Sequence, residues 1–175
     1  MAYPEFDQTK TARRLRDSID TVIGAARMVP AACIHALMPG LPKDAWTVAM
    51  NLAHLVVYDE GISVPVLESL ASGADGTTLI RTDNEGWFYN DAVALSSQPL
   101  DALISRLEEA RARQVDIVQS FSAVDWNRRW SPAFSSGLHG NGPHSPAWIA
   151  TKSFQHTWEH GSAVLRAALF APRPD

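Results

Sequence analysis

The stretch from Ser145 to Leu169 constrains the fold of this chain more than any other part of the sequence. Ser145 is suited to accept a hydrogen bond from the free amide groups of a first helical turn, and Pro146 suits the first helical position. No further glycine or proline occurs before Gly161, and the apolar residues recur with helical spacing. The sequence therefore predicts one long helix over this range.

Two histidines of this predicted helix, His156 and His160, are four residues apart. That spacing places both imidazoles on one helix face, about one turn from each other. The same face carries apolar residues, so it is expected to point toward the interior of the protein. Two buried imidazoles at this spacing can share a metal ion if another part of the chain supplies a third ligand. His139 and His144, in the connection before the helix, are more typical of ordinary loop residues.

Three further helices are expected from apolar residues that recur every three or four positions. They span residues 7–37 with a kink or break at Pro30, 44–72 with a bend at Pro65, and 99–121. The connection 73–98 is the longest irregular stretch and is expected to hold a short helix near residues 84–94. In the third helix, the charged residues, among them Arg106 and Arg111, are expected to form a solvated face.

Four helices, two long connections and no convincing strand pattern predict an all-α four-helix bundle that forms a single domain, 1–175. Hydrophobic residues make up 46% of the chain and charged residues 19%, as in soluble globular proteins. The net charge of −4 argues against nucleic acid or an anionic membrane surface as a partner. Cys33 is the only cysteine, so no internal disulfide forms, which fits a cytoplasmic location.

His54 is the candidate third ligand, because it lies in the middle of the second predicted helix among apolar residues. A lone histidine in such a helix is more often a hydrogen-bonded core residue. With the pair on the last helix, however, it would complete a three-histidine site with an open position, as in catalytic zinc sites. Imidazole also suits nickel and iron. Tyr58, one turn later, is the nearest phenol and a candidate catalytic residue, and Asp59 and Glu60 are candidates for orienting the His54 ring.

These residues resemble the DinB-like superfamily. The resemblance is carried by Trp46 at the start of the second helix, by Ala53-His54-Leu55 in its middle, and by the H-x-x-x-H motif on the last helix. The nearest branch is the N-terminal domain of mycothiol-dependent maleylpyruvate isomerases. The resemblance implies a four-helix bundle of up-down-down-up order, a divalent metal ion on His54, His156 and His160, and a homodimer.

The resemblance also implies thiol-dependent transfer or isomerisation, in which the metal activates a low-molecular-weight thiol such as mycothiol toward a small electrophilic substrate. Some members of that branch have a carboxylate where this chain has His156, which leaves the substrate open. One alternative is a non-catalytic bundle that binds a metal or a small ligand. A second is metal-assisted hydrolysis, because His156 to His160 also match the H-x-x-E-H motif of inverted zinc proteases, with Glu159 as the general base.

Overall fold

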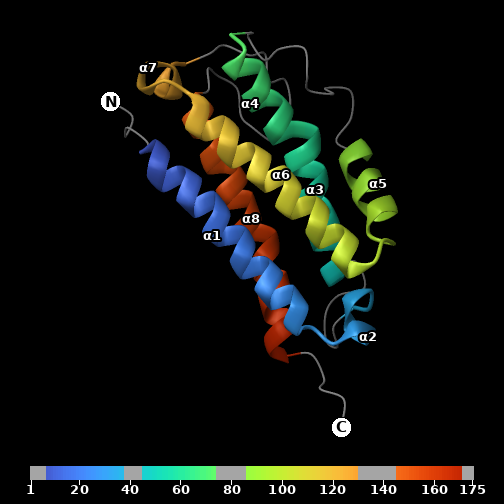
Figure 1. The fold of residues 1–175 in the computed structure, drawn as a ribbon. Coiled ribbons are helices and arrows are strands. Elements are labelled where there is room, and N and C mark those ends of the chain that lie inside the picture. Colours follow the sequence, from blue (N-terminus) through green and yellow to red (C-terminus); the bar gives the residue numbers. More distant parts are fainter. Residues whose placement is uncertain (1–6, 38–44, 74–85, 130–144, 171–175) are drawn as a thin grey trace.

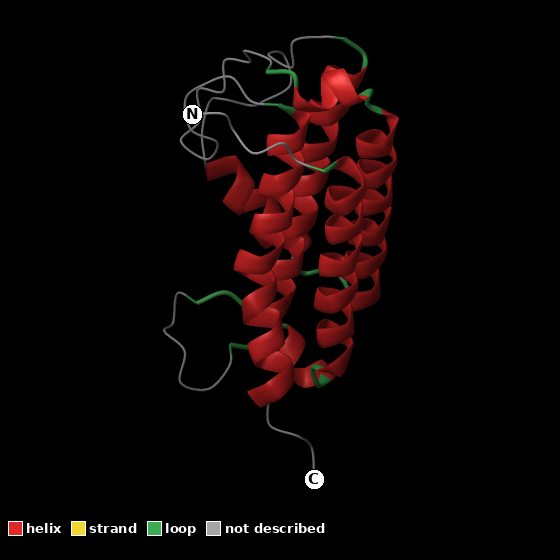
Figure 2. Ribbon diagram, turned by 90° about the vertical axis from the view of Figure 1, so that its left-hand side faces the viewer, coloured by secondary structure: helices red, strands yellow, loops and turns green. Residues whose placement is uncertain are grey.

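The computed structural model describes residues 7–37, 45–73, 86–129 and 145–170, although the side chains of residues 86–88 are not described. Every regular element in these ranges is a helix, and the long helices lie side by side (Figures 1 and 2). The prediction of an all-α protein is therefore confirmed. Within the described residues, no helix has the length and apolar character needed to cross a membrane.

The first predicted helix ends earlier than expected. Helix α1 (Gln8–Met28) begins after Asp7, whose side chain accepts a hydrogen bond from the backbone N–H of Lys10. Val29 is extended because it precedes Pro30, and the chain then forms only the short helix α2 (Ala31–Ile34). The break at Pro30 was predicted, whereas the continuation to Leu37 was wrong.

The second predicted helix is interrupted by a wider turn. It consists of α3 (Val48–Tyr58), the π-helical turn η1 (Asp59–Ser63) and α4 (Val64–Ala71). The side chain of Thr47 caps α3 by accepting from the N–H of Met50. Pro65 has no N–H to donate and its ring crowds the carbonyl four residues earlier, which explains the local π turn. Gly73, with φ of 83°, follows the end of α4.

The remaining elements agree with the expected ranges, with one addition. They are α5 (Gly86–Leu95), α6 (Leu100–Ser120), α7 (Ala123–Asn127) and α8 (Pro146–Phe170). The short helix α7 was not predicted; it starts where Ser122 accepts from the N–H of Asp125, and it buries Trp126. The start of α8 follows the prediction, because Ser145 accepts from the N–H of Trp148 at 3.1 Å.

The long helices pack around a shared apolar interior. Helices α1 and α8 run in one direction, and α3 with α4 and α6 run in the other (Figure 1). Helix α1 packs against α8 and α6, and α3 packs against α5, α8 and α6. The largest fully buried apolar side chains include Leu15, Leu52, Leu67, Leu103 and Ile149. This arrangement brings α3 next to α8, the two helices that carry the predicted metal ligands.

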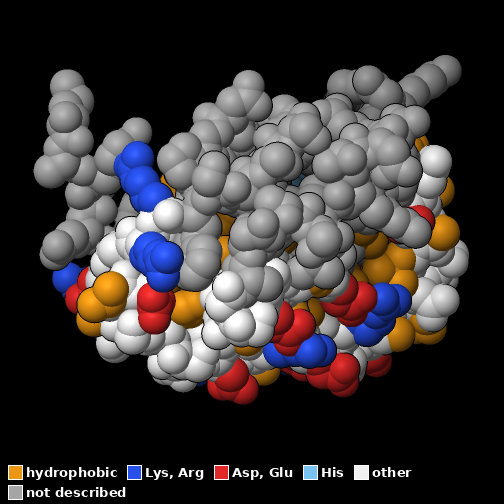
Figure 3. All heavy atoms as spheres, turned by 90° about the horizontal axis from the view of Figure 1, so that it is seen from above, with side chains coloured by type: hydrophobic (Ala, Val, Ile, Leu, Met, Phe, Trp, Pro, Cys, Tyr) orange, Lys and Arg blue, Asp and Glu red, His pale blue; other side chains and the backbone are white. Residues whose placement is uncertain are grey.

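Seen from above the bundle, the described part of the surface carries acidic and basic side chains next to one another (Figure 3). Two of the ion pairs in the described residues connect α6 to its neighbours: Arg106 with Glu60 of η1, and Arg113 with Glu68 of α4. All four side chains are substantially exposed, so each pair contributes about 1 kcal/mol or less. The surface pairs therefore influence the packing of the bundle only weakly.

Gly161 allows α8 to approach α1 closely. A Cβ atom at this position would overlap Cγ2 of Val22, a β-branched side chain with little freedom to move. Gly161→Ala is expected to lower the free energy of unfolding by about 1–3 kcal/mol, although alanine is intrinsically the better helix former. Urea denaturation measures this change.

Gly24→Ala is the matched control, because a Cβ atom on Gly24 of α1 would meet no atom within 4 Å. This substitution is expected to leave stability unchanged or to raise it by up to about 1 kcal/mol. Gly161→Ala should also cost less in a Val22→Ala background, where the overlapping methyl group is absent. Equal effects of the two glycine substitutions would show that the close approach at Gly161 does not constrain the bundle.

Candidate metal centre

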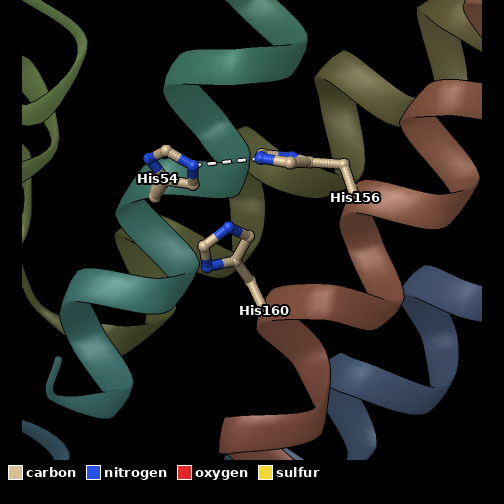
Figure 4. A group of neighbouring side chains, drawn as sticks. All are labelled: His54, His156 and His160. Carbon is tan, nitrogen blue, oxygen red and sulfur yellow. Dashed lines mark hydrogen bonds between the residues drawn. The ribbon is translucent and has the colours of Figure 1, made fainter. Parts of the chain in front are cut away.

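Three histidines from two helices meet inside the bundle. His54 comes from α3, and His156 and His160 come from α8 (Figure 4). One ring nitrogen from each residue lies within 4.8 Å of the others. His54 is only 8% exposed, and the two histidines of α8 are half-buried. The three side chains proposed as metal ligands from the sequence therefore lie close enough to act together.

The three rings do not make equal contacts. Nε2 of His54 and Nε2 of His156 are 3.0 Å apart, so in the neutral rings one nitrogen donates its hydrogen to the other. Burial, with a smaller effect of His160, lowers the pKa of His54 to about 3. Burial also lowers the pKa of His160. Both rings are therefore neutral at neutral pH, which is the state in which imidazole binds metal ions.

Aromatic side chains surround the cluster. The ring of Trp46 stacks on His160 with centroids 5.2 Å apart and meets His54 at a steeper angle at 4.7 Å. The ring of Tyr58 lies 4.1 Å from that of His156. Tyr89 of α5 lies 6.1 Å from Trp46 and extends this aromatic wall. These rings limit the access of water to the imidazoles, which strengthens electrostatic interactions in the site.

Asn51 is a site residue that the sequence reasoning missed. It lies on α3, is 4% exposed, and its Oδ1 is 3.2 Å from Nδ1 of His160. The available signal was an amide side chain one turn before His54 in an otherwise apolar helix, because a buried amide requires hydrogen-bond partners.

The sequence profile of the DinB superfamily matches residues 25–164, a range that includes all three histidines. This chain belongs to the DinB superfamily. A search of curated proteins found no match.

Several solved structures share this fold at low sequence identity. An uncharacterised protein from Clostridium difficile 630 has a TM-score of 0.75 at 12% identity, with 98% of this chain and all of that chain covered. The mycothiol-dependent maleylpyruvate isomerase has a TM-score of 0.67 at 14% identity, and the match covers 89% of this chain and 60% of the isomerase. The colibactin self-resistance protein ClbS, described in complex with double-stranded DNA, has a TM-score of 0.68 at 13% identity, covering 98% and 100%.

These similarities confirm the DinB-like fold and identify an isomerase among the structural neighbours. They do not support the exclusion of nucleic acid that the net charge suggested, because ClbS is described with bound DNA. At identities of 12–14%, what these structures share with this DinB-superfamily member is the fold.

The two candidate catalytic residues differ in environment. Tyr58 is buried, and its burial raises the pKa of the phenol, with Asp59 adding to the rise and a hydrogen bond with Ser153 opposing it. The hydroxyl group of Tyr58 is therefore protonated and interacts with Ser153 on α8. Glu159 is exposed on α8, and its charge partly offsets the lowering of the pKa of His160.

The expectation that Asp59 or Glu60 orients His54 is wrong. Asp59 is 1% exposed and forms an ion pair at 2.7 Å with Arg111, which is 2% exposed. Glu60 points to the surface and pairs with Arg106.

The expectation that Arg111 belongs to a solvated face is also wrong. Burial of a charge requires a partner of opposite charge, and the sequence does not show which acid and base on different helices will meet.

A buried polar network extends from this ion pair to α8. Arg111 also donates to Oγ1 of Thr157 at 2.9 Å. Gln114 donates to Oγ of Ser153 at 2.7 Å, and Ser153 in turn donates to Oγ of Ser63 at 2.6 Å. Thr157 and Ser153 lie on either side of His156 in the sequence of α8. The network therefore ties α8 to η1 and α6 beside the histidine cluster.

Stability of the metal-free protein is expected to depend on pH through His54. Between an ordinary histidine pKa of 6.5 and the folded-state value of about 3, the unfolded chain binds one more proton than the folded protein. The free energy of unfolding is therefore highest above pH 6.5. It falls as the pH drops toward 3, by at most about 1.4 kcal/mol per pH unit from this histidine. Urea denaturation at a series of pH values measures the slope. His54→Gln should reduce it, and an identical slope in this variant would contradict the assignment.

Breaking the buried ion pair is expected to cost much more than breaking a surface pair. Arg111→Met leaves Asp59 buried without its partner and should lower the free energy of unfolding by about 3–5 kcal/mol. The double variant Asp59→Leu/Arg111→Met should be more stable than the sum of the two single effects predicts. Arg106→Met is the control, at about 1 kcal/mol or less. Equal losses in the two arginine variants, measured by urea denaturation, would contradict this prediction.

Proposed function

We propose that this protein is a metal-dependent enzyme that transfers or isomerises a small electrophile with the help of a low-molecular-weight thiol. His54, His156 and His160 would bind the metal ion. The observation that carries the proposal is the convergence of three imidazoles from two helices in an aromatic-walled interior. Of these, His54 and His160 have lowered pKa values, so the site offers metal-binding lone pairs at neutral pH.

The donor set fits a divalent transition-metal ion. Two nitrogen atoms bound to one zinc ion in tetrahedral geometry are about 3.3 Å apart, because each Zn–N bond is about 2.0–2.1 Å long. The spacings of the ring nitrogens, from 3.0 Å up to 4.8 Å, bracket that value. Neutral imidazole also suits nickel and iron, so zinc is the first choice and the other two are alternatives.

Three protein ligands leave at least one position for an exogenous ligand, as in catalytic zinc sites. A divalent ion at this position would lower the pKa of a bound thiol, so that a thiolate is available at neutral pH. Among the chain's own residues, Trp46 and Tyr58 limit the access of water to the rings. The half-buried His156 and His160 leave part of the cluster accessible to a small molecule.

The choice of a thiol-dependent reaction is supported by the structural neighbour whose name states dependence on mycothiol. Mycothiol is therefore the thiol to test first. The chain spans only 60% of that isomerase, and the identity is 14%, so maleylpyruvate is not proposed as the substrate. A homodimer and a cytoplasmic location stay predictions.

Metal content of the purified protein tests the ligand set. The unaltered protein is expected to bind about one divalent ion per chain, measured by elemental analysis, because its three imidazoles converge on one point. Alanine at His54, His156 or His160 should each reduce the bound metal sharply. His35→Ala is the matched control, since His35 is exposed on the chain after α2 and outside the cluster. Full metal content in His54→Ala would exclude this site.

The same preparations separate an enzyme from a binding protein. Metal-loaded protein is mixed with mycothiol and the electrophile monochlorobimane, and conjugate formation is followed by fluorescence. A rate above that of the metal-free protein and of His54→Ala supports the proposed activity. Metal binding without any such rate across several thiols would favour the non-catalytic metal-binding alternative.

A further inference from the structure

Asn51 connects the start of α3 to the His160 ring. Its side-chain Nδ2 donates to the carbonyl oxygen of Thr47 at 2.9 Å, and the carbonyl of Trp46 lies 3.5 Å from the same nitrogen. Its Oδ1 faces Nδ1 of His160 at 3.2 Å. The amide therefore bridges the first turn of its own helix and a histidine on α8.

The orientation of this amide follows from its neighbours. A backbone carbonyl can only accept hydrogen bonds, so the NH₂ group of Asn51 must face Thr47 and its oxygen must face His160. The amide oxygen can also only accept. Nδ1 of His160 must then carry the hydrogen, which leaves Nε2 of the neutral ring with a free lone pair.

The position of the His160 ring agrees with this assignment. In Figure 4, one of its nitrogens points toward His54 and His156, and the other points toward α3, which carries Asn51. Trp46 stacks on the face of the same ring, with an interplanar angle of 20°. The ring is thus held at its edge by Asn51 of α3 and across its face by Trp46, which lies just before α3.

We propose that Asn51 is a positioning residue that holds His160 as the Nδ1–H tautomer, with the Nε2 lone pair directed into the histidine cluster before any metal ion binds. The role in metal binding rests on the proposed function, whereas the tautomer is a property of the protein alone. His54 and His156 differ, because their Nε2 atoms share a hydrogen that metal binding must displace. The tautomer of His160 is therefore set in advance by a neighbouring amide.

Long-range ¹H–¹⁵N NMR of the metal-free protein at neutral pH tests the tautomer directly. The His160 signals are assigned as those missing in His160→Gln. The expected result is a pyrrole-like shift for Nδ1 and a pyridine-like shift for Nε2. A protonated Nε2 on His160 in the unaltered protein would overturn the proposal, whether or not the protein binds metal.

Two substitutions of Asn51 test the cause. Asn51→Leu has a similar size but no acceptor, so the His160 tautomer should become mixed and zinc affinity should fall by about tenfold or more. Asn51→Asp keeps an acceptor toward Nδ1 and should retain the tautomer. Affinity is measured by competition with a chromophoric chelator, and thermal unfolding shows whether each variant is folded.

The outcomes distinguish this inference from the proposed function. A folded Asn51→Leu with an unchanged tautomer overturns the role of Asn51. If Asn51→Leu does not fold, the spectra of the unaltered protein and of Asn51→Asp decide, and loss of the Nδ1–H tautomer in Asn51→Asp overturns it. A protein that shows the expected tautomer but binds no zinc would exclude the metal-dependent function and leave the positioning of His160 intact.

Discussion

The ion pair between Asp59 and Arg111 is the interaction on which the middle of the bundle depends. Both side chains are almost completely buried, and a charge buried in an apolar interior is tolerated only with a partner and further hydrogen bonds. The pair therefore requires η1 and α6 to stay in contact, and the bond from Arg111 to Thr157 extends this requirement to α8. Asp59 follows α3, which carries His54, and Thr157 follows His156. The helices that bear the candidate ligands are thus held together by polar contacts beside the cluster.

The fold alone does not identify the chemistry of this DinB-superfamily member. Solved structures with the same fold include an isomerase described as mycothiol-dependent and a protein described in complex with DNA, both at 13–14% identity. Because proteins with this fold are described so differently, a function can be argued only from the residues of the site. Here those residues are imidazoles, two of them neutral because burial lowers the pKa values of His54 and His160. Their arrangement is the basis for the metal site proposed above.

Local features of the fold were predictable because they depend on neighbours in the sequence. The cap at Ser145 and the break at Pro30, both predicted, each involve residues within one helical turn. The π turn before Pro65 was expected only as a bend, because proline indicates that a helix must adjust but not how. Arg111 was assigned to the wrong face, since a charged residue on a helix is usually solvated and its partner lies 52 residues away.

The sequence by itself determined the helices and the residue types available for a metal site, because helical periodicity and the spacing of His156 and His160 are local properties. Only the tertiary structure decided which side chains meet across helices. In the folded protein, His54 lies close to the pair on α8. Asn51, and not Asp59 or Glu60, contacts an imidazole, and Asp59 is buried against Arg111. The physical reason is that these contacts depend on how helices pack and which polar groups need partners in the interior, and both are properties of the assembled bundle.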